Sequence, residues 1–381
     1  MALRRITADD LLARWADFDA LIDARSESEF ALDHLPGAVN WPSLNDEERH
    51  LVGTEYKQVS PFDARKRGAA MVARNIAAHV ERELSLTTRD WRPLVYCWRG
   101  GQRSGALATV LDHIGFQVHV LEGGYSEFRR AVREQLDTLP ARLTLVAVCG
   151  RTGSGKSRLL QSLAIAGAQV LDLEDLACHR GSVLGPLPGR PQPSQKAFET
   201  RIWHALRGLD AARPAFVESE SRTIGRLRVP EALLLQLRGS ACVQLQMPLP
   251  ARVAFLLEDY AHFVRDVDTF CLRLDALREV CGADIVQAWQ TRARAGGLAD
   301  VVLELLTQHY DPIYTRSMQR NFAQLASAPT LELDDGQPAT LAAAAHRLMN
   351  MGLLAPAATE AADDAADDAA NKSANDGPAG T

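Results

Sequence analysis

The sequence predicts an α/β protein with two domains, each built on a parallel sheet, followed by a disordered acidic tail. Short apolar strands alternate with helical segments. A cysteine loop follows a strand in the first half, and a glycine-rich loop follows one in the second. With 381 residues the chain is long enough for both domains. We expect them at residues 1–138 and 139–353, with an Ala/Asp-rich tail at 354–381.

Most of the net charge of −6 belongs to the tail, which contains Lys372 and six acidic residues. The acids are Glu360, Asp363, Asp364, Asp367, Asp368 and Asp376. The body is therefore almost neutral, and its charge neither supports nor excludes an RNA partner.

The six cysteines are scattered, without a CxxC pair or a Cys/His cluster. This favours reduced thiols in the cytoplasm and argues against a metal site made only of protein ligands. Asp9 and Asp10 interrupt the N-terminal segment before an apolar run can form. No stretch is long enough to cross a bilayer, so we expect neither a signal peptide nor a membrane partner.

In the first domain, residues 20–25 indicate a strand, 26–30 a capped helical turn, 34–40 a turn into another strand, and 118–121 a further strand. Four residues in these loops carry polar chemistry: Asp23, Arg25, Glu29 and His34. They are either catalytic or structural, and positions of this kind more often serve the loops themselves.

The cysteine loop follows a strand at residues 94–96 and precedes a helix at 106–111. Its residues are Cys97, Trp98, Arg99, Gly100, Gly101, Gln102, Arg103 and Ser104. Backbone N–H groups at the helix start, together with the two arginines, predict an anion cradle around a thiol that ionises easily. The alternative is an inert buried cysteine, which the flanking glycines and arginines disfavour.

Five residues separate Cys97 from Arg103. This spacing is similar to that of cysteine-dependent phosphatases and of longer-looped rhodanese relatives, whereas sulfur-carrying rhodaneses have a shorter loop. The wider cradle favours a tetrahedral phosphorus oxyanion over a lone persulfide. A phosphate ester or a phosphate-like chalcogen donor is the expected ligand.

The second domain opens with an apolar strand at residues 143–148 and a phosphate-binding loop, followed by a helix. The loop residues are Gly150, Arg151, Thr152, Gly153, Ser154, Gly155, Lys156 and Ser157. Backbone amides should surround a di- or triphosphate, Lys156 should reach its outer phosphates, and Ser157 is a suitable ligand for Mg²⁺. The strand-loop-helix context makes a chance glycine-rich turn a poor alternative.

Carboxylates follow the next two strands, at residues 169–175 and 215–220. Glu218 and Glu220 are candidate magnesium ligands or bases, and Asp172 and Glu174 are weaker candidates; all four are also compatible with ordinary strand ends. A strand at 243–248, a long helical region at 253–306 and a last strand at 330–333 complete the domain.

Polar segments between these strands are candidates for contact with tRNA or with a diphosphate. They contain His179, Arg180, Gln195 and Lys196, and then the basic cluster Arg222, Arg226 and Arg228. A lid, an anion site and a solvated turn all fit this composition.

The signature at residues 23–38, the cysteine loop and the Leu-Glu-Gly-Gly-Tyr run at 121–125 together resemble a rhodanese domain. Residues 46–65, 173–182, 191–196, 220–225 and 309–312 are similar to segments of the tRNA 2-selenouridine synthase family. The resemblance covers nearly everything before residue 354. It implies a rhodanese-like domain and a kinase-like P-loop domain with a helical insertion. Gln102 replaces an expected Met and Ser219 an expected Asp; the second departure weakens any need for an acid there.

The resemblance also implies a function. Family members convert wobble 2-thiouridine of certain tRNAs into 2-selenouridine with selenophosphate, and they geranylate the same sulfur from geranyl diphosphate as an activating step. Selenophosphate would then bind at Cys97, whose thiolate would take up selenium as a perselenide or attack the activated intermediate. The loop at residues 150–157 would hold geranyl diphosphate without ATP, and tRNA would span both sites.

Two other functions stay open. One is a cysteine-dependent phosphatase or an ATP-dependent sulfurtransferase of rhodanese type, which the segments at residues 191–196 and 309–312 argue against. The other is a nucleotide-binding regulatory module with an inert Cys97. A prenyl channel has the same sequence signature as an ordinary core, and the oligomeric state has no signature here.

Overall fold

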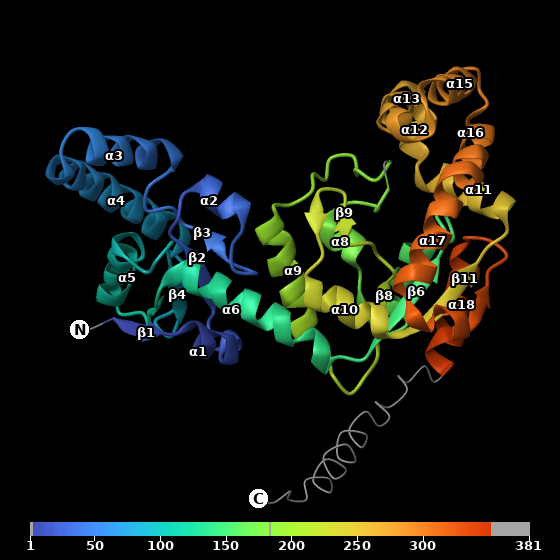
Figure 1. Ribbon diagram of the computed structural model, residues 1–381. Helices are drawn as coiled ribbons and strands as arrows, with labels where there is room; N and C mark the ends of the chain where they lie inside the picture. The colour runs from blue at the N-terminus through green and yellow to red at the C-terminus, as the bar shows by residue number, and fades with distance from the viewer. Residues whose placement is uncertain (1–2, 183, 352–381) are drawn as a thin grey trace, which may run out of the picture.

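Two α/β units lie side by side in the computed structural model, joined by the helix α6 (Gly124–Thr138), which confirms the expected fold class (Figure 1). The structure describes residues 3–182 and 184–351, so the predicted tail lies outside the described residues. None of the helices in these two ranges is both long and apolar enough to cross a membrane.

The first unit alternates strands and helices. Its elements before α6 are β1 (Arg4–Ile6), α1 (Ala8–Ala13), η1 (Trp15–Asp17), β2 (Ala20–Asp23), α2 (Glu27–Leu32), β3 (Val39–Asn40), α3 (Asp46–Gln58), α4 (Pro61–Glu83), β4 (Pro93–Tyr96), α5 (Gln102–Ile114) and β5 (His119–Leu121). The strands form a parallel sheet in the order β1-β5-β4-β2-β3.

Both faces of this sheet are buried, because alternate side chains of a strand point to opposite faces. Leu94 and Tyr96 of β4 pack with Phe128 of α6 on one face. Val95 packs with Leu107 of α5 on the other. β4 is the middle strand, so Cys97 leaves the carboxyl edge at the centre of the sheet.

Helices α3 and α4 form a hairpin that stands away from the second unit (Figure 1). Asn45 and Glu48 form a capping box at the start of α3, and Ser60 caps α4 ahead of Pro61. These caps satisfy N–H groups that would otherwise lack partners. No secondary structure was predicted for the residues of this hairpin.

The second unit begins with η2 (Pro140–Arg142) and has a parallel sheet of its own. Its next elements are β6 (Leu145–Gly150), α7 (Lys156–Ile165), β7 (Gln169–Leu171), α8 (Leu173–Ala177), α9 (Gln195–Arg207), β8 (Ala215–Glu218), β9 (Thr223–Ile224), β10 (Leu227–Arg228), α10 (Glu231–Gly239), β11 (Ala241–Gln246) and α11 (Leu249–Asp259). The sheet order is β12-β11-β6-β8-β7, with β12 (Thr330–Glu332) at one edge.

The helical region expected at residues 253–306 is present as a series of short helices, which continue beyond it. They are α12 (Ala261–Arg265), α13 (Val267–Leu274), η3 (Asp275–Leu277), α14 (Arg278–Cys281), α15 (Ala283–Arg294), α16 (Leu298–Glu304), the π-helix η4 (Leu305–Tyr310), α17 (Asp311–Asn321), η5 (Ala323–Ser327) and α18 (Pro338–Asn350). Helices α11 to α16 gather into a lobe beside the second sheet (Figure 1).

The strand expected at residues 169–175 ends at Leu171, four residues earlier than predicted. Asp172 has extended backbone geometry and accepts a hydrogen bond from the N–H of Asp175, so it caps α8 instead of extending the strand. Asp is among the preferred residues at this position. Glu174 and Asp175 therefore belong to the first turn of a helix.

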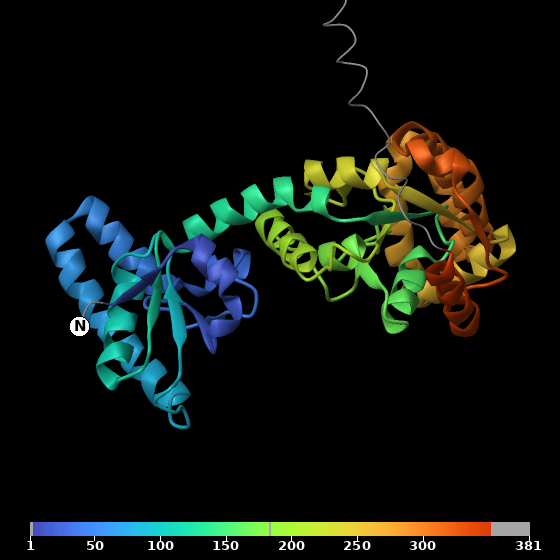
Figure 2. The same ribbon diagram turned by 90° about the horizontal axis from the view of Figure 1, so that it is seen from below.

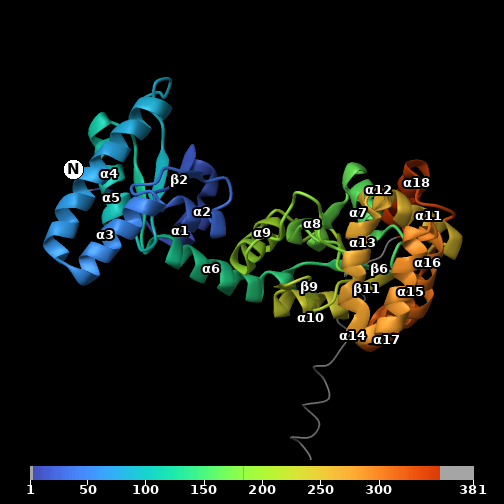
Figure 3. The ribbon, with the colours of Figure 1, turned by 90° about the horizontal axis from the view of Figure 1, so that it is seen from above.

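The two units share one hydrophobic core. Phe128 on α6 packs edge-to-face against Trp203 on α9, and both belong to a buried cluster that extends into both sheets. Figure 2 shows α6 running from the first unit to the second, and Figure 3 shows α9 beside it. The Arg129 guanidinium also binds Glu199 and Thr200 of α9.

Candidate active sites: a cysteine loop and a phosphate-binding pocket

Cys97 lies at the floor of the predicted loop. Its Sγ accepts hydrogen bonds from the N–H of Gly101 at 3.3 Å and from the hydroxyl of Ser104 at 3.1 Å. Helix α5 starts at Gln102, earlier than expected, and its N-cap residue Gly101 supplies the N–H that reaches the sulfur. Donors of this kind stabilise a thiolate.

The sulfur is deeply set: Cys97 is 3% exposed, whereas Trp98, Arg99 and Gln102 on the rim are exposed. Cys97 therefore presents a buried sulfur with two hydrogen-bond donors beside it, and this is compatible with the predicted oxyanion ligand.

Arg103 does not supply the free positive charge that the sequence suggested. Its guanidinium donates to Glu29 at 2.7 Å, and Glu29 also pairs with Arg49 at 3.1 Å. Burial opposes ionisation of Glu29, but these two arginines outweigh it and leave its pKa below the ordinary value. Arg103 thus fixes the loop to α2, and Arg99 remains as the exposed cation of the cradle.

Two glycines let α6 hold the cysteine loop from behind. Gly100 has φ +65°, and a Cβ there would lie 2.7 Å from the carbonyl oxygen of Leu121. Gly124 has φ +57°, and its Cβ would lie 2.2 Å from the carbonyl oxygen of Cys97. Only glycine fits such positions without strain. The N–H of Tyr125 then donates to the Cys97 carbonyl at 2.8 Å.

The other polar residues of the rhodanese-like signature are structural. Asp23 and Arg25 form a buried ion pair at 2.6 Å, and the guanidinium lies 3.9 Å from the ring centroid of Tyr125. The Nδ1 atom of His34 lies 2.9 Å from the Phe30 carbonyl, and the two rings stack. Each of these contacts fastens a loop under the cradle.

The phosphate-binding loop joins β6 to α7 at the centre of the second sheet. Gly153 and Gly155 have φ +78° and +83°, and Lys156 donates to the Gly150 carbonyl at 2.7 Å. With the helix N-terminus facing the same space, this loop is built to bind phosphate.

Residues far away in the sequence position this loop. Arg252 is 3% exposed, donates twice to the Thr152 carbonyl and pairs with Asp311 at 2.6 Å. The Tyr314 hydroxyl accepts from the N–H of Gly150. Asp311 belongs to the family-like segment at residues 309–312 and Tyr314 lies just beyond it, and the sequence alone predicts no role for either.

A pocket of about 580 Å³ opens at the loop, and its lining carboxylates include Asp172, Glu174 and Glu220. Glu218 is buried and does not line the pocket. Glu174 accepts from Ser157 at 2.8 Å, and Glu218 accepts from the N–H of Glu174. Burial, reinforced by the neighbouring carboxylates, raises the pKa of Glu218 well above its ordinary value and that of Glu220 to about 8. Burial is also the main reason that the pKa of Asp172 rises to about 6.

A metal site formed by protein alone is not evident in this pocket. Within residues 3–182 and 184–351, no group of three or more His, Cys, Asp or Glu side chains is arranged to hold an ion. Ser157 and Glu174 nevertheless present adjacent oxygen atoms at the phosphate loop, and such oxygens are suitable Mg²⁺ ligands when a phosphate supplies the rest.

The predicted substrate residues divide into two groups. Arg180 pairs with Asp259 and lines the phosphate pocket; His179 is buried and its Nδ1 accepts from the N–H of Gly181. Gln195 is bonded to the backbone of Arg228 in both directions, which makes it a brace for the β9-β10 hairpin. Gln195 therefore has a structural role, whereas His179 lines the phosphate pocket beside Arg180.

The remaining predicted cations are Lys196 and three arginines of the second unit. Lys196, at the start of α9, has its Nζ 5.7 Å from the ring centroid of Trp98, so the second unit places a cation at the mouth of the cysteine loop. Arg222, Arg226 and Arg228 are exposed on the adjoining hairpin, with Arg226 also bonded to the Gln192 carbonyl. Ser219, where an Asp was expected, lies 3.5 Å from the Tyr314 hydroxyl.

Comparison with known proteins matches both units. Residues 7–131 fit the family model described as "Rhodanese-like domain", and residues 143–270 fit "tRNA 2-selenouridine synthase AAA domain". A relative from Nitrosomonas europaea, named tRNA 2-selenouridine synthase, is 38% identical over 259 residues, which cover 67% of each chain. A relative of the same name from Alcanivorax borkumensis is 32% identical over 343 residues, covering 82% of this chain and 92% of its own.

Each loop therefore lies in a unit that matches a family model. The match to the Alcanivorax relative covers most of both chains. On this ground the chain belongs to the tRNA 2-selenouridine synthase family.

Proposed function

We propose that this chain converts wobble 2-thiouridine in tRNA into 2-selenouridine, using geranyl diphosphate to activate the sulfur and selenophosphate to supply selenium. The observation that carries the proposal is the pairing of two oxyanion-binding loops in one chain. One loop contains Cys97 and the other contains Lys156. Each loop follows a central strand of its own sheet.

The phosphate pocket serves the geranyl step. The sulfur of 2-thiouridine attacks C1 of the geranyl group, the C–O bond breaks, diphosphate leaves, and the base loses its N3 proton. Lys156 and the loop amides stabilise the leaving diphosphate. Ser157 and Glu174 would hold a Mg²⁺ that accompanies it.

The cysteine loop serves the selenium step. The selenium of selenophosphate attacks C2 of the base, the C–S bond breaks, and geranylthiol leaves with a proton. The phosphoryl group still on selenium then moves to the Cys97 sulfur, which breaks the P–Se bond, and water releases inorganic phosphate. A perselenide on Cys97 would instead require the P–Se electron pair to stay on phosphorus, giving phosphite. The hydrogen-bond donors beside Cys97 suit the oxygens of a phosphoryl group, and this supports attack on phosphorus.

The cations near the cysteine loop support tRNA as the shared substrate. Lys196 lies beside Trp98 of this loop. Arg222 and Arg228 are exposed at the β9-β10 hairpin, where Arg228 is bonded to Gln195, the neighbour of Lys196. These side chains are suitable phosphate contacts.

The test is nucleoside mass spectrometry of thiolated tRNA incubated with both co-substrates. Wild type should form 2-selenouridine and inorganic phosphate. Lys156→Ala should form roughly 100-fold less geranylated nucleoside. Cys97→Ser should still geranylate but stall before 2-selenouridine, and Cys281→Ser, a thiol in the helical lobe, should match wild type. Full 2-selenouridine yield from Cys97→Ser, or phosphite as the phosphorus product, would refute the assigned chemistry.

A further inference from the structure

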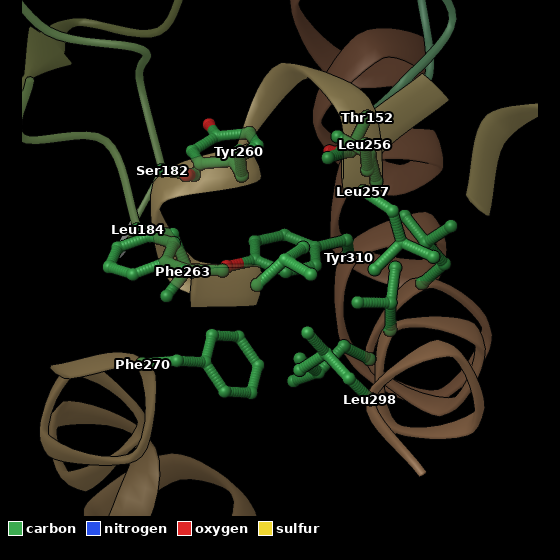
Figure 4. A pocket seen from close by; sticks show the side chains of 14 residues that line it. Thr152, Ser182, Leu184, Leu256, Leu257, Tyr260, Phe263, Phe270, Leu298 and Tyr310 are labelled. Carbon is green, nitrogen blue, oxygen red and sulfur yellow. The ribbon is translucent and has the colours of Figure 1, made fainter. Parts of the chain in front are cut away.

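An apolar pocket adjoins the phosphate-binding loop within the helical lobe (Figure 4). Its walls come from α11, α12, α13, α16 and the π-helix η4. The apolar lining residues are Leu184, Leu256, Leu257, Phe263, Val264, Phe270, Leu298, Val302, Leu305 and Leu306. Among the described residues that line it, only Thr152, Ser182, Tyr260 and Tyr310 have polar side-chain atoms.

This pocket and the phosphate pocket are continuous. Thr152, Ser182, Leu256, Tyr260 and Tyr310 line both. In Figure 4, Thr152, Ser182 and Tyr260 lie at one side of the apolar pocket, and Phe270 and Leu298 lie at the opposite side. A ligand held by the loop at its phosphate end would therefore extend its other end toward Phe270 and Leu298.

We propose that this apolar pocket binds the hydrocarbon chain of an allylic diphosphate whose phosphates sit on the Lys156 loop. The proposal rests on the proposed function and deepens it, by assigning the residues that recognise the geranyl group. A nucleoside in the same place would leave its base and ribose polar groups without partners, because most of the lining is apolar, including Phe263, Phe270, Leu298 and Leu305.

The fold couples the two pockets through one continuous segment. Leu305, Leu306 and Tyr310 of η4 line the apolar pocket, while the next residues, Asp311 and Tyr314, position the phosphate loop. The π-helical turn itself is the less common geometry that is frequent at functional sites. The same segment therefore lines the apolar pocket and positions the phosphate loop.

The small free volume of the apolar pocket favours a short hydrocarbon chain in the ligand. Its free volume is about 40 Å³, less than the roughly 150 Å³ that accommodates benzene in an apolar cavity, so lining side chains must move apart when a chain binds. Val264 is 46% exposed and Leu184 is half-buried, so both can swing outward. A tight pocket of this kind favours ten carbons over fifteen.

The experiment changes Leu298 in the full-length protein and measures transfer from geranyl and farnesyl diphosphates to thiolated tRNA. Leu298→Ala should shift the geranyl-to-farnesyl ratio of kcat/KM toward farnesyl by roughly tenfold or more. Leu298→Phe should weaken geranyl diphosphate binding by about tenfold and leave the affinity for inorganic diphosphate within twofold. Leu303, on the same helix but 38% exposed and outside the pocket, provides matched Ala and Phe controls that should behave as wild type.

The proposal is overturned if both Leu298 variants keep the wild-type preference, or if wild type binds geranyl diphosphate no more tightly than inorganic diphosphate. Binding is measured by calorimetry, without tRNA, so it decides the pocket even where transfer fails. Absence of geranyl transfer by wild type would refute the proposed function, whereas transfer with unchanged chain-length selectivity in the variants would refute only the pocket. If Leu298→Phe fails to fold, the Leu298→Ala ratio decides.

Discussion

The carboxylate of Glu218 is almost completely buried. It is 1% exposed at the end of β8, its Oε1 accepts from the N–H of Glu174 at 2.6 Å, and its Oε2 has no partner among the described residues. Burial and the nearby Asp172, Glu174 and Glu220 raise its pKa. The folded state therefore binds a proton more tightly than the unfolded state, and stability from this group falls as pH rises above roughly 4.3.

Glu218→Gln should remove this dependence. The free energy of unfolding of the variant is measured with urea between pH 5 and pH 8. The difference between variant and wild type should increase, in favour of the variant, by up to roughly 1 kcal/mol per pH unit. Glu231→Gln, at an exposed position, is the control. Parallel curves for wild type and Glu218→Gln would show that Glu218 is ionised at pH 5 and that its pKa is not raised.

The candidate residues Cys97 and Lys156 were predictable because each belongs to a local sequence motif. The residues that position their loops were not predictable, because they lie far away in the sequence. Cys97 and Lys156 each follow an apolar strand and precede a helix, so a short window of sequence contains the whole signal. The bond from Arg252 to Thr152 and the ion pair of Arg252 with Asp311 join residues far apart in the chain. Placing Arg103 against Glu29 likewise required the folded chain.

Among the elements, α6 connects the cysteine loop to the second unit. Its first turn donates from Tyr125 to the Cys97 carbonyl, and its middle carries Arg129 and Phe128 against α9. Gly124 permits the contact, because any Cβ at this position would collide with the loop carbonyl. The cysteine loop therefore depends on a helix that also belongs to the shared core.

Gly124→Ala should destabilise the protein by roughly 2 kcal/mol more than Gly37→Ala. Both positions have positive φ, +57° and +77°, but an added Cβ at Gly37 meets no atom within 4 Å. Only the first variant adds a clash to the strain, and it should also lower 2-selenouridine formation. Equal unfolding free energies, measured by urea denaturation, would contradict the role given to this contact.

The sheets were predictable as elements because buried parallel strands are continuous apolar runs. The exceptions have local causes. Asp172 ends β7 by capping α8, and the hairpin of α3 and α4 has a largely exposed, charged surface without the apolar run of a strand. Capping by Asp266 and the positive φ of Gly282 divide the helical lobe into short helices.

On the scale of the whole molecule, the two units behave as one body. The cluster containing Phe128 and Trp203 continues from one sheet to the other, and buried Asp33 accepts from Tyr125 and from Thr200 of the second unit. No sequence pattern marks these contacts, because each partner looks like an ordinary core or loop residue of its own domain. They hold the cysteine loop and the phosphate loop in fixed relative positions, as a shared substrate requires.

The central claim is a division of labour between the two loops, and a transfer experiment tests it most directly. Thiolated tRNA is first treated with Cys97→Ser and geranyl diphosphate, repurified, and then given to Lys156→Ala with selenophosphate, with nucleosides measured by mass spectrometry. The account predicts that 2-selenouridine forms in the second step, although neither variant makes it alone from thiolated tRNA. No 2-selenouridine from the geranylated tRNA, while wild type converts the same sample, would contradict the account.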